Sequence, residues 1–249
     1  MTWVESHSLS FTARHDDSQA SQAEAVLEEL ESFRRELEGL FKRTPYEIAV
    51  VIHPRSLMLT LAQPWLPLAR MVAAPASRRY FAGWFSSSEI HVLAPEALEA
   101  RASGVGGSRE ALLRTPRHEY AHLVVGANNR DLPPPFTFGS FRRYVRWAWL
   151  CEGSATHFSG QTRHLRAAIL RRLREGPRPE LPPSARDAQL LGGTLFSLVE
   201  QDAGTDAAVA LAMTPDSQTP RRALEAVFGR PLSQVARDWR DHLDSLTAA

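Results

Sequence analysis

The order of apolar and polar side chains predicts strands and a helix in the first part of the chain. Residues 8–13 alternate polar and apolar side chains, which predicts a half-buried strand. Residues 18–41 repeat apolar side chains at helical spacing, which predicts an amphipathic helix packed on a sheet. Residues 46–52 are apolar except for Glu47, as is typical of a central strand covered on both faces. The apolar side of the first predicted strand consists of Leu9, Phe11 and Ala13.

The next stretch predicts two more strands after a pair of short helices. Residues 56–71 are rich in leucine but contain Pro64 and Pro67, which allow short helical segments and exclude one long helix. Residues 79–85 and 88–93 are predicted to be strands. The first half of the chain therefore favours a sheet with helices packed against it.

From residue 108 onwards the pattern predicts mainly helices. One helix is expected to begin with Ser108 as its N-cap and to continue to about Gly126. A stiff, non-helical connection is expected over the proline-rich residues 128–140. Paired glycines at 192–193 indicate a close approach to a neighbouring helix. The later predicted helices lie within residues 141–174, 184–203, 205–213 and 219–249, and the last is interrupted at 229–231.

The helix predicted from Ser108 carries the sequence Arg-His-Glu-Tyr-Ala-His. Four residues of an α-helix are about 400° of rotation, so the imidazoles of His118 and His122 project from one face and can bind one metal ion. Glu119 lies about 100° further round, where a carboxylate can reach a water molecule at the metal without being a ligand. Catalytic zinc takes a third protein ligand. Glu152, in the sequence Trp-Leu-Cys-Glu-Gly-Ser-Ala, can supply it.

These two motifs resemble those of the gluzincin metallopeptidases, most closely the small bacterial peptidase-MA-like group. The matching residues are His-Glu-x-x-His at 118–122 and Trp-Leu-x-Glu-Gly-x-Ala at 149–155, and a weaker likeness in pattern covers most of the chain. The resemblance implies a single domain with an α+β, zincin-like fold. A mixed sheet and the active-site helix would occupy residues 1–127, and a helical lobe would occupy residues 128–249. An edge strand within residues 82–88 would bind an extended peptide.

The same resemblance implies a zinc-dependent peptidase. Glu119 is the expected general base, which activates water for attack on a peptide bond and passes the proton to the leaving amine. The oxyanion formed in that reaction needs a further hydrogen-bond donor, for which Tyr144 and His157 are two alternatives. The expected cofactor is Zn²⁺ and its expected ligands are His118, His122 and Glu152.

Two other interpretations of the sequence are an inactive protein of the same fold and a helical interaction module. A catalytically inactive protein of the same fold would bind a peptide or protein partner in the cleft. A helical interaction module would leave the paired motifs unexplained. Zinc content separates this last interpretation from the others, and peptide turnover separates an enzyme from an inactive relative.

Two residues close to Glu152 need a separate interpretation: Thr156, which departs from the family pattern, and Cys151, which could be taken for a fourth ligand. Many gluzincins have an aspartate one turn after the ligand glutamate, whereas this chain has Thr156, whose hydroxyl can accept an imidazole N–H more weakly. Cys151 precedes the glutamate directly. Because adjacent helical residues point about 100° apart, Cys151 is interpreted as a small buried apolar residue and not as a fourth ligand.

Composition and charge restrict the partners. The chain has 249 residues, 43% of them hydrophobic, which suffices for the core of one domain. Its net charge of +1 gives no overall field that would favour nucleic acid or an anionic membrane, so neither is an expected partner. Cys151 is the only cysteine, which excludes an intrachain disulfide. The sequence leaves the oligomeric state and the cleavage preference open.

The N-terminal sequence bears on localisation. Met-Thr-Trp-Val-Glu-Ser-His-Ser contains no basic segment followed by an apolar one, as a secretory signal would. As written, the chain is expected to be cytoplasmic, and it would be exported if a signal had been removed from its N-terminus.

Overall fold

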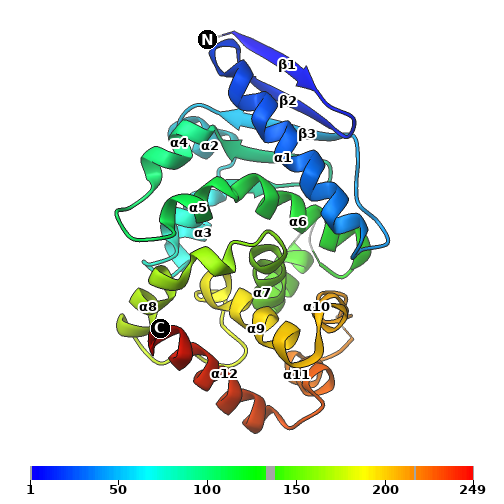
Figure 1. The fold of residues 1–249 in the computed structure, drawn as a ribbon, viewed down its shortest axis with the longest axis vertical. Coiled ribbons are helices and arrows are strands. Elements are labelled where there is room, and N and C mark those ends of the chain that lie inside the picture. Colours follow the sequence, from blue (N-terminus) through cyan, green and yellow to red (C-terminus); the bar gives the residue numbers. More distant parts are fainter. Residues whose placement is uncertain (1, 133–137, 216, 249) are drawn as a thin grey trace.

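A five-stranded sheet and a set of packed helices make up the described chain. The structure is a computed structural model that describes residues 2–132, 138–215 and 217–248. The sheet lies at one end of the molecule and the later helices lie at the other (Figure 1). The strands are β1 (Trp3–His7), β2 (Phe11–Asp16), β3 (Ile48–His53), β4 (Gly83–Phe85) and β5 (Glu89–Leu93). The helices of the sheet-containing half are α1 (Ala20–Glu38), α2 (Ser56–Ala62), α3 (Leu66–Val72), α4 (Pro95–Arg101), α5 (Ser108–Leu113) and α6 (Thr115–Asn128). The helices that follow are α7 (Phe138–Phe158), α8 (Arg166–Arg174), α9 (Ala188–Ala203), α10 (Thr205–Ala212), α11 (Pro220–Phe228) and α12 (Leu232–Ala248).

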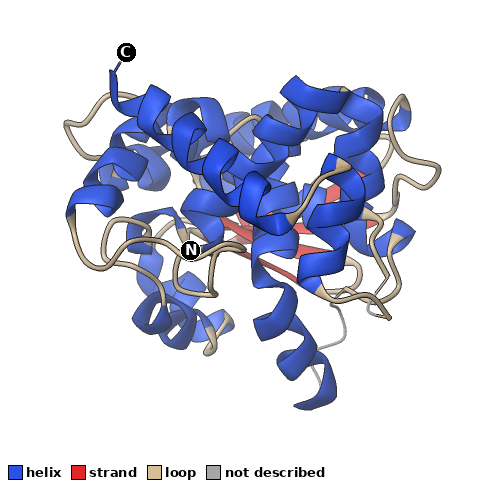
Figure 2. Cartoon of the chain, turned by 90° about the horizontal axis from the view of Figure 1, so that it is seen from below, coloured by secondary structure: helices blue, strands red, loops and turns tan. Residues whose placement is uncertain are grey.

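The sheet is mixed and ends in a short antiparallel strand. Its order is β1-β2-β3-β5-β4, with β2, β3 and β5 parallel and the two outer strands antiparallel to their neighbours. Seen from below, the strands lie behind helices that occupy most of the view (Figure 2). The edge strand β4 lies within residues 82–88, where the resemblance implied an edge.

One face of the sheet packs on α1 and α6. Side chains alternate along each strand, so Phe11, Val50 and Ile90 share this face. The Phe11 ring meets the ring of Tyr120 on α6 with centroids 5.1 Å apart, and Phe33 of α1 contacts the same tyrosine. The sheet therefore fixes α6, the helix that carries both histidines of the motif.

Several predicted elements are confirmed. The helix expected within residues 18–41 is α1, and its predicted apolar side chains at 26, 27, 30, 33 and 37 are buried. The central strand is β3, and the leucine-rich region forms the short helices α2 and α3 on either side of Pro64.

The strand predicted over residues 8–13 is wrong in its position. The chain turns at residues 8–10 between β1 and β2, and Leu9, expected on the buried side, is 97% exposed. Polar contacts fix this turn, because Glu31 of α1 accepts hydrogen bonds from the Ser8 hydroxyl and the Ser10 amide. An alternating pattern does not distinguish a strand from a hairpin turn of this kind.

Two other boundaries differ for identifiable reasons. The helix predicted from residue 108 to 126 is divided into α5 and α6 at Arg114, because Pro116 lacks the N–H needed to continue the first helix. Its N-cap is Gly107, and the Ser108 hydroxyl instead accepts a hydrogen bond from the Ser103 amide. Of the predicted strand 79–85, only β4 is a strand, and residues 78–80 form a 3-10 helix.

The connection predicted over residues 128–140 is only partly described. Its prolines lie within residues 133–137, outside the described residues, and α7 begins at Phe138.

Backbone contact between α7 and α9 holds the helical half together. A Cβ added to Gly192 would lie 2.5 Å from the carbonyl oxygen of Trp149, and one added to Gly153 would lie 2.6 Å from the carbonyl carbon of Gly192. Only glycine permits such an approach. The close helix contact predicted from the paired glycines is thus confirmed, and it places Glu152, next to Gly153, on the side of α7 that faces α6.

A buried histidine pair lies on the opposite face of the sheet. His53 Nε2 is 3.0 Å from His91 Nδ1. Burial, followed by the charge of His91, lowers the pKa of His53 to about 4. A histidine in an unfolded chain titrates near pH 6.5, at about its reference value. Between these pH values the unfolded chain binds more protons than the folded one, so the fold loses stability as the pH falls.

We therefore expect the melting temperature to fall as the pH is lowered from about 6.5 towards about 4. His53→Gln should reduce this dependence because the side chain no longer titrates. His7→Gln, which changes an exposed histidine, should keep the wild-type dependence. Thermal unfolding followed by circular dichroism over this pH range measures both, and an unchanged slope in His53→Gln would contradict the assignment.

Candidate metal centre

Two helices bring together three side chains suited to metal binding. His118 and His122 lie one turn apart on α6, and Glu152 reaches them from α7. Their exposed fractions are 4%, 4% and 6%, so all three are buried. One ligand atom from each lies within 4.8 Å of the others, and the described part of the chain holds no second group of this kind. The structure thus brings the three predicted ligands together.

The distances between these atoms fit a tetrahedral zinc site. The two histidine Nε2 atoms are 3.1 Å apart, and Glu152 carboxylate oxygens lie 3.4 Å from His118 Nε2 and 3.8 Å from His122 Nε2. Bonds of about 2.0–2.1 Å in a tetrahedron separate neighbouring ligand atoms by about 3.3 Å. Two imidazoles and one carboxylate are also a donor set that catalytic zinc sites use. The residues present therefore fit a zinc ion.

The ionisation of the cluster favours metal binding at two of the three ligands. Burial lowers the pKa of His122 to about 3. Burial would raise the pKa of Glu152, but the charge of His122 and the hydrogen bond and charge of His118 lower it to about 2. Burial would lower the pKa of His118, but Glu152 and Glu119 together raise it. Metal binding requires a neutral imidazole; burial favours that form at His122, whereas Glu152 and Glu119 favour the charged form of His118.

Glu119 lies beside the cluster without joining it. Burial raises its pKa to about 8, against the lowering effect of His118. A cation held by the three ligands would lower this pKa and bring it towards the neutral range in which a general base works best. Glu119 is thus a buried carboxylate next to the ligand cluster, with a pKa raised by its burial.

The edge strand β4 comes directly against this carboxylate. A Cβ built on Gly83 would lie 2.4 Å from Glu119 Oε1, so a side chain at this position would displace the glutamate. Two residues along, the Phe85 ring stacks on His122 with centroids 4.2 Å apart. The sheet edge thus borders both the candidate base and a candidate ligand.

Different neighbours orient the two imidazoles. Cys151 Sγ lies 3.5 Å from His122 Nδ1, and burial raises the pKa of its thiol, so Cys151 is a neutral partner for the Nδ1–H group. Cys151 is buried as expected, but its contact with His122 was not predicted. Because Nδ1 faces sulfur, Nε2 of His122 is left for the metal.

His118 faces Gln161 and not Thr156. The Gln161 side chain favours the charged form of His118. Nε2 of Gln161 donates a hydrogen bond to the Ala111 carbonyl at 2.8 Å. Among the described residues, neither Gln161 Oε1 nor His118 Nδ1 has a hydrogen-bond partner within normal geometry. Thr156, expected as a weak substitute for aspartate, donates instead to the Gln189 carbonyl at 3.3 Å. Gln161 Oε1 is therefore the candidate acceptor for the Nδ1–H group of His118.

The two candidate oxyanion donors are placed differently. Tyr144 Oη donates to Glu152 Oε1 at 2.7 Å, across a non-helical residue at Trp147 that bends α7. Burial, followed by the charge of Glu152, raises the pKa of Tyr144, so its hydroxyl remains a donor. His157 points towards α9, where its Nε2 lies 3.6 Å from Glu200 Oε2. The structure brings Tyr144 to the cluster and holds His157 away from it.

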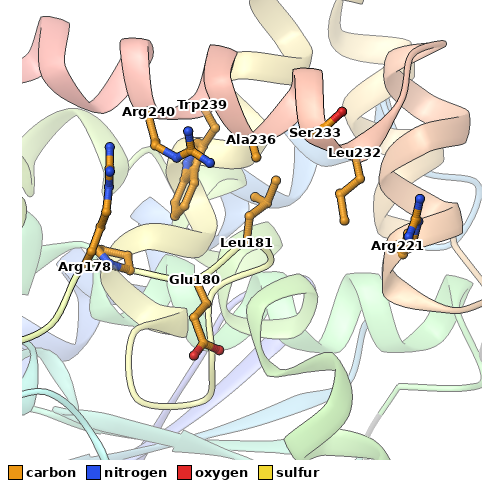
Figure 3. Close-up of a pocket in the computed structure, with 10 residues that line it drawn as sticks. Arg178, Glu180, Leu181, Arg221, Leu232, Ser233, Ala236, Trp239 and Arg240 are labelled. Atoms are coloured by element: carbon orange, nitrogen blue, oxygen red, sulfur yellow. The ribbon is translucent and has the colours of Figure 1, made fainter.

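A separate hollow lies elsewhere in the helical half. It has a volume of about 770 Å³ and lies between the segment containing Glu180 and Leu181 and the helices α11 and α12 (Figure 3). Trp239 forms part of its wall. Its lining contains no histidine or cysteine and only one carboxylate, so it offers no ligand set for a metal.

Comparison with known proteins gives no match from which the role of this site could be inferred. No protein-family model matches the chain, and neither a curated protein nor a solved structure matches it.

The ligand assignment predicts the zinc content of variants. Wild-type protein should bind one zinc ion per chain, and His122→Ala and Glu152→Ala should each lose it, because two donors do not complete the site. His157→Ala is the matched control, since it lies on the same helix as Glu152 but contacts α9. Elemental analysis after removal of loosely bound metal measures the content, and full occupancy in either ligand variant would contradict the assignment.

The contacts around His118 predict that Gln161, and not Thr156, orients this ligand and so affects zinc affinity. Gln161→Ala should weaken zinc affinity by about 10–100-fold, the usual effect of removing a partner that orients a ligand. Gln161→Glu should restore it, because a carboxylate also accepts the Nδ1–H bond. Thr156→Val should leave the affinity unchanged. Competition with a zinc chelator measures all three, and a larger effect of Thr156→Val than of Gln161→Ala would reverse the assignment.

Proposed function

We propose that this protein is a zinc-dependent metallopeptidase of the gluzincin type with a zincin-like fold. The observation that carries the proposal is the convergence of His118, His122 and Glu152 at tetrahedral spacing, with the Glu119 carboxylate beside them and outside the ligand set. A structural metal site requires no such carboxylate. A base next to an incomplete ligand set is the arrangement expected for hydrolysis.

The proposed reaction assigns a task to each side chain. Zinc, when bound, would polarise the peptide carbonyl and lower the pKa of a water molecule. Glu119 accepts the proton of that water and delivers it to the leaving amine. Tyr144, held protonated by its raised pKa, donates a hydrogen bond to the oxyanion after turning from Glu152 Oε1, which is 2.7 Å away.

The edge strand β4 supports a peptide as substrate. In many complexes an extended peptide adds to the edge strand of a sheet through main-chain hydrogen bonds. At Gly83 that edge meets Glu119, so a peptide lying along β4 would carry its carbonyl groups past the base. The absence of a side chain at Gly83 leaves the Glu119 carboxylate in place, which a larger residue would prevent.

A catalytically inactive protein that binds a peptide in the same cleft is the second candidate. The same edge strand supports it, because binding to β4 requires neither metal nor base. The buried Glu119 carboxylate beside the three candidate ligands favours the enzyme, because binding of a peptide along β4 would not require it.

Removing the base should abolish turnover and retain the metal. Glu119→Gln preserves the shape of the side chain but cannot accept a proton, so peptide turnover should fall by about 10²–10⁴-fold with zinc content unchanged. Glu28→Gln changes an exposed glutamate of α1 and should behave as wild type. Turnover of a diverse peptide library, followed by mass spectrometry, measures the loss.

Three outcomes have distinct meanings for this proposal. Wild-type turnover in a zinc-loaded Glu119→Gln protein would refute the assigned base. Loss of zinc in that variant would show that Glu119 holds the site together. If the wild type binds zinc and cleaves no peptide, the inactive candidate replaces the enzyme.

A further inference from the structure

A dense group of exposed apolar side chains lies on α2 and α3. Of the twelve large hydrophobic side chains exposed in the described chain, six lie between residues 57 and 72, so half of them occupy a small part of the sequence. Single exposed apolar residues are ordinary, whereas a contiguous group indicates an interaction surface. The six side chains and their exposed fractions are Leu57 (67%), Leu61 (74%), Trp65 (62%), Leu68 (41%), Met71 (67%) and Val72 (53%).

The spacing of these residues directs them away from the protein. Leu57 and Leu61 are four apart on α2, and Leu68 and Val72 are four apart on α3, so each pair shares a helix face. One leucine on each helix is fully buried, at positions 59 and 66, and attaches it to the body of the molecule. Each helix thus packs on the protein through one buried leucine and exposes other apolar side chains to solvent. We call the six exposed residues the apolar surface.

The chain segment that carries the apolar surface has basic residues and no acidic ones. Between Glu47 and Glu89 the chain contains no aspartate or glutamate, whereas it contains four arginines. The balanced net charge of +1 over the whole chain conceals this local excess. Arg55, just before α2, and Arg78, after α3, are exposed. The expectation of no membrane partner rested on the net charge, which does not describe this region.

We propose that α2 and α3 dock the protein onto an anionic lipid surface. Leucine, methionine and tryptophan side chains enter the boundary between head groups and acyl chains, and flanking arginines bind the anionic head groups. Tryptophan in particular favours this interfacial region. The apolar surface and its arginines match both parts of that environment.

A second copy of the chain is a poorer occupant for the same surface. In a twofold dimer the same patch meets itself, so the arginines of both copies would be brought together with no acidic residue in this region to oppose them. Like charges across an interface disfavour association. Charge complementarity therefore selects the lipid over self-association.

The docking would be peripheral. Among the described residues no helix is long and apolar enough to cross a membrane, and α2 and α3 have seven residues each. Arg70 of α3 donates two hydrogen bonds to the Phe81 carbonyl, at 3.0 and 2.7 Å, close to the start of β4. Lipid docking would hold this edge of the sheet near the membrane, whether or not the metal centre is active.

Vesicle flotation with the full chain tests the proposal. The probes are vesicles of phosphatidylcholine alone and vesicles of equal parts phosphatidylcholine and phosphatidylglycerol. The protein should float with the anionic vesicles, and salt should weaken the binding. Leu61→Ser/Trp65→Ser/Met71→Ser should reduce the partition coefficient at least about tenfold. Arg55→Gln should reduce it about fivefold.

Leu9→Ser is the matched control, because Leu9 is 97% exposed and lies outside the apolar surface. It should bind vesicles as the wild type does, and circular dichroism should show that every variant is folded. Failure of the wild type to float with anionic vesicles would overturn the proposal, as would equal flotation of the folded triple variant. Self-association without lipid that the triple variant abolishes would assign the surface to a second copy instead.

Discussion

Burial of the Glu152 carboxylate between two imidazoles is the interaction on which the arrangement of the helical half depends. A charged carboxylate is costly to remove from water unless it is paired and hydrogen-bonded. Here the partners come from elsewhere in the fold, since His118 and His122 lie on α6 and the Tyr144 hydroxyl lies beyond the bend in α7. The charge of His122 and the hydrogen bond and charge of His118 lower the pKa of Glu152 against the effect of burial. The packing of α7 must therefore be accurate, and the contact between Gly153 and Gly192 provides it.

The same requirement explains the role of the sheet. A metal site built from two helices needs α6 fixed independently of α7, and the aromatic contacts of Tyr120 with Phe11 and Phe33 hold α6 on the sheet. The edge strand completes the site from the other side through Gly83 and Phe85. Gly83 leaves room for the Glu119 carboxylate, and the Phe85 ring stacks on His122. The chemistry of the centre thus constrains residues that carry no chemistry themselves.

The parts of the site that could be predicted from sequence follow local rules. The spacing of His118 and His122 reflects the helical period, which any helix imposes. Glu152 was found through a motif whose glycine proves to be a packing residue. The contacts of Gln161 and Cys151 with the histidines were not predicted, because they depend on how three segments pack. In the fold, helices with a regular apolar side were located well, whereas the turn at residues 8–10 was missed because its hydrogen bonds to Glu31 link segments distant in sequence.

The net charge of the whole chain does not describe the charge of a single surface. A net charge of +1 is the sum of regions that differ in sign, and a surface interacts with its partner over about a Debye length, which is roughly 8 Å at physiological ionic strength. The stretch between Glu47 and Glu89, which has four arginines and no acidic residue, includes β3, α2, α3 and β4. A lipid surface against α2 and α3, as proposed above, would meet the exposed Arg55 and Arg78 of this stretch. Arg70 ties α3 to the carbonyl of Phe81, two residues before the strand that borders Glu119, so a short stretch of chain connects the apolar surface with the candidate active site.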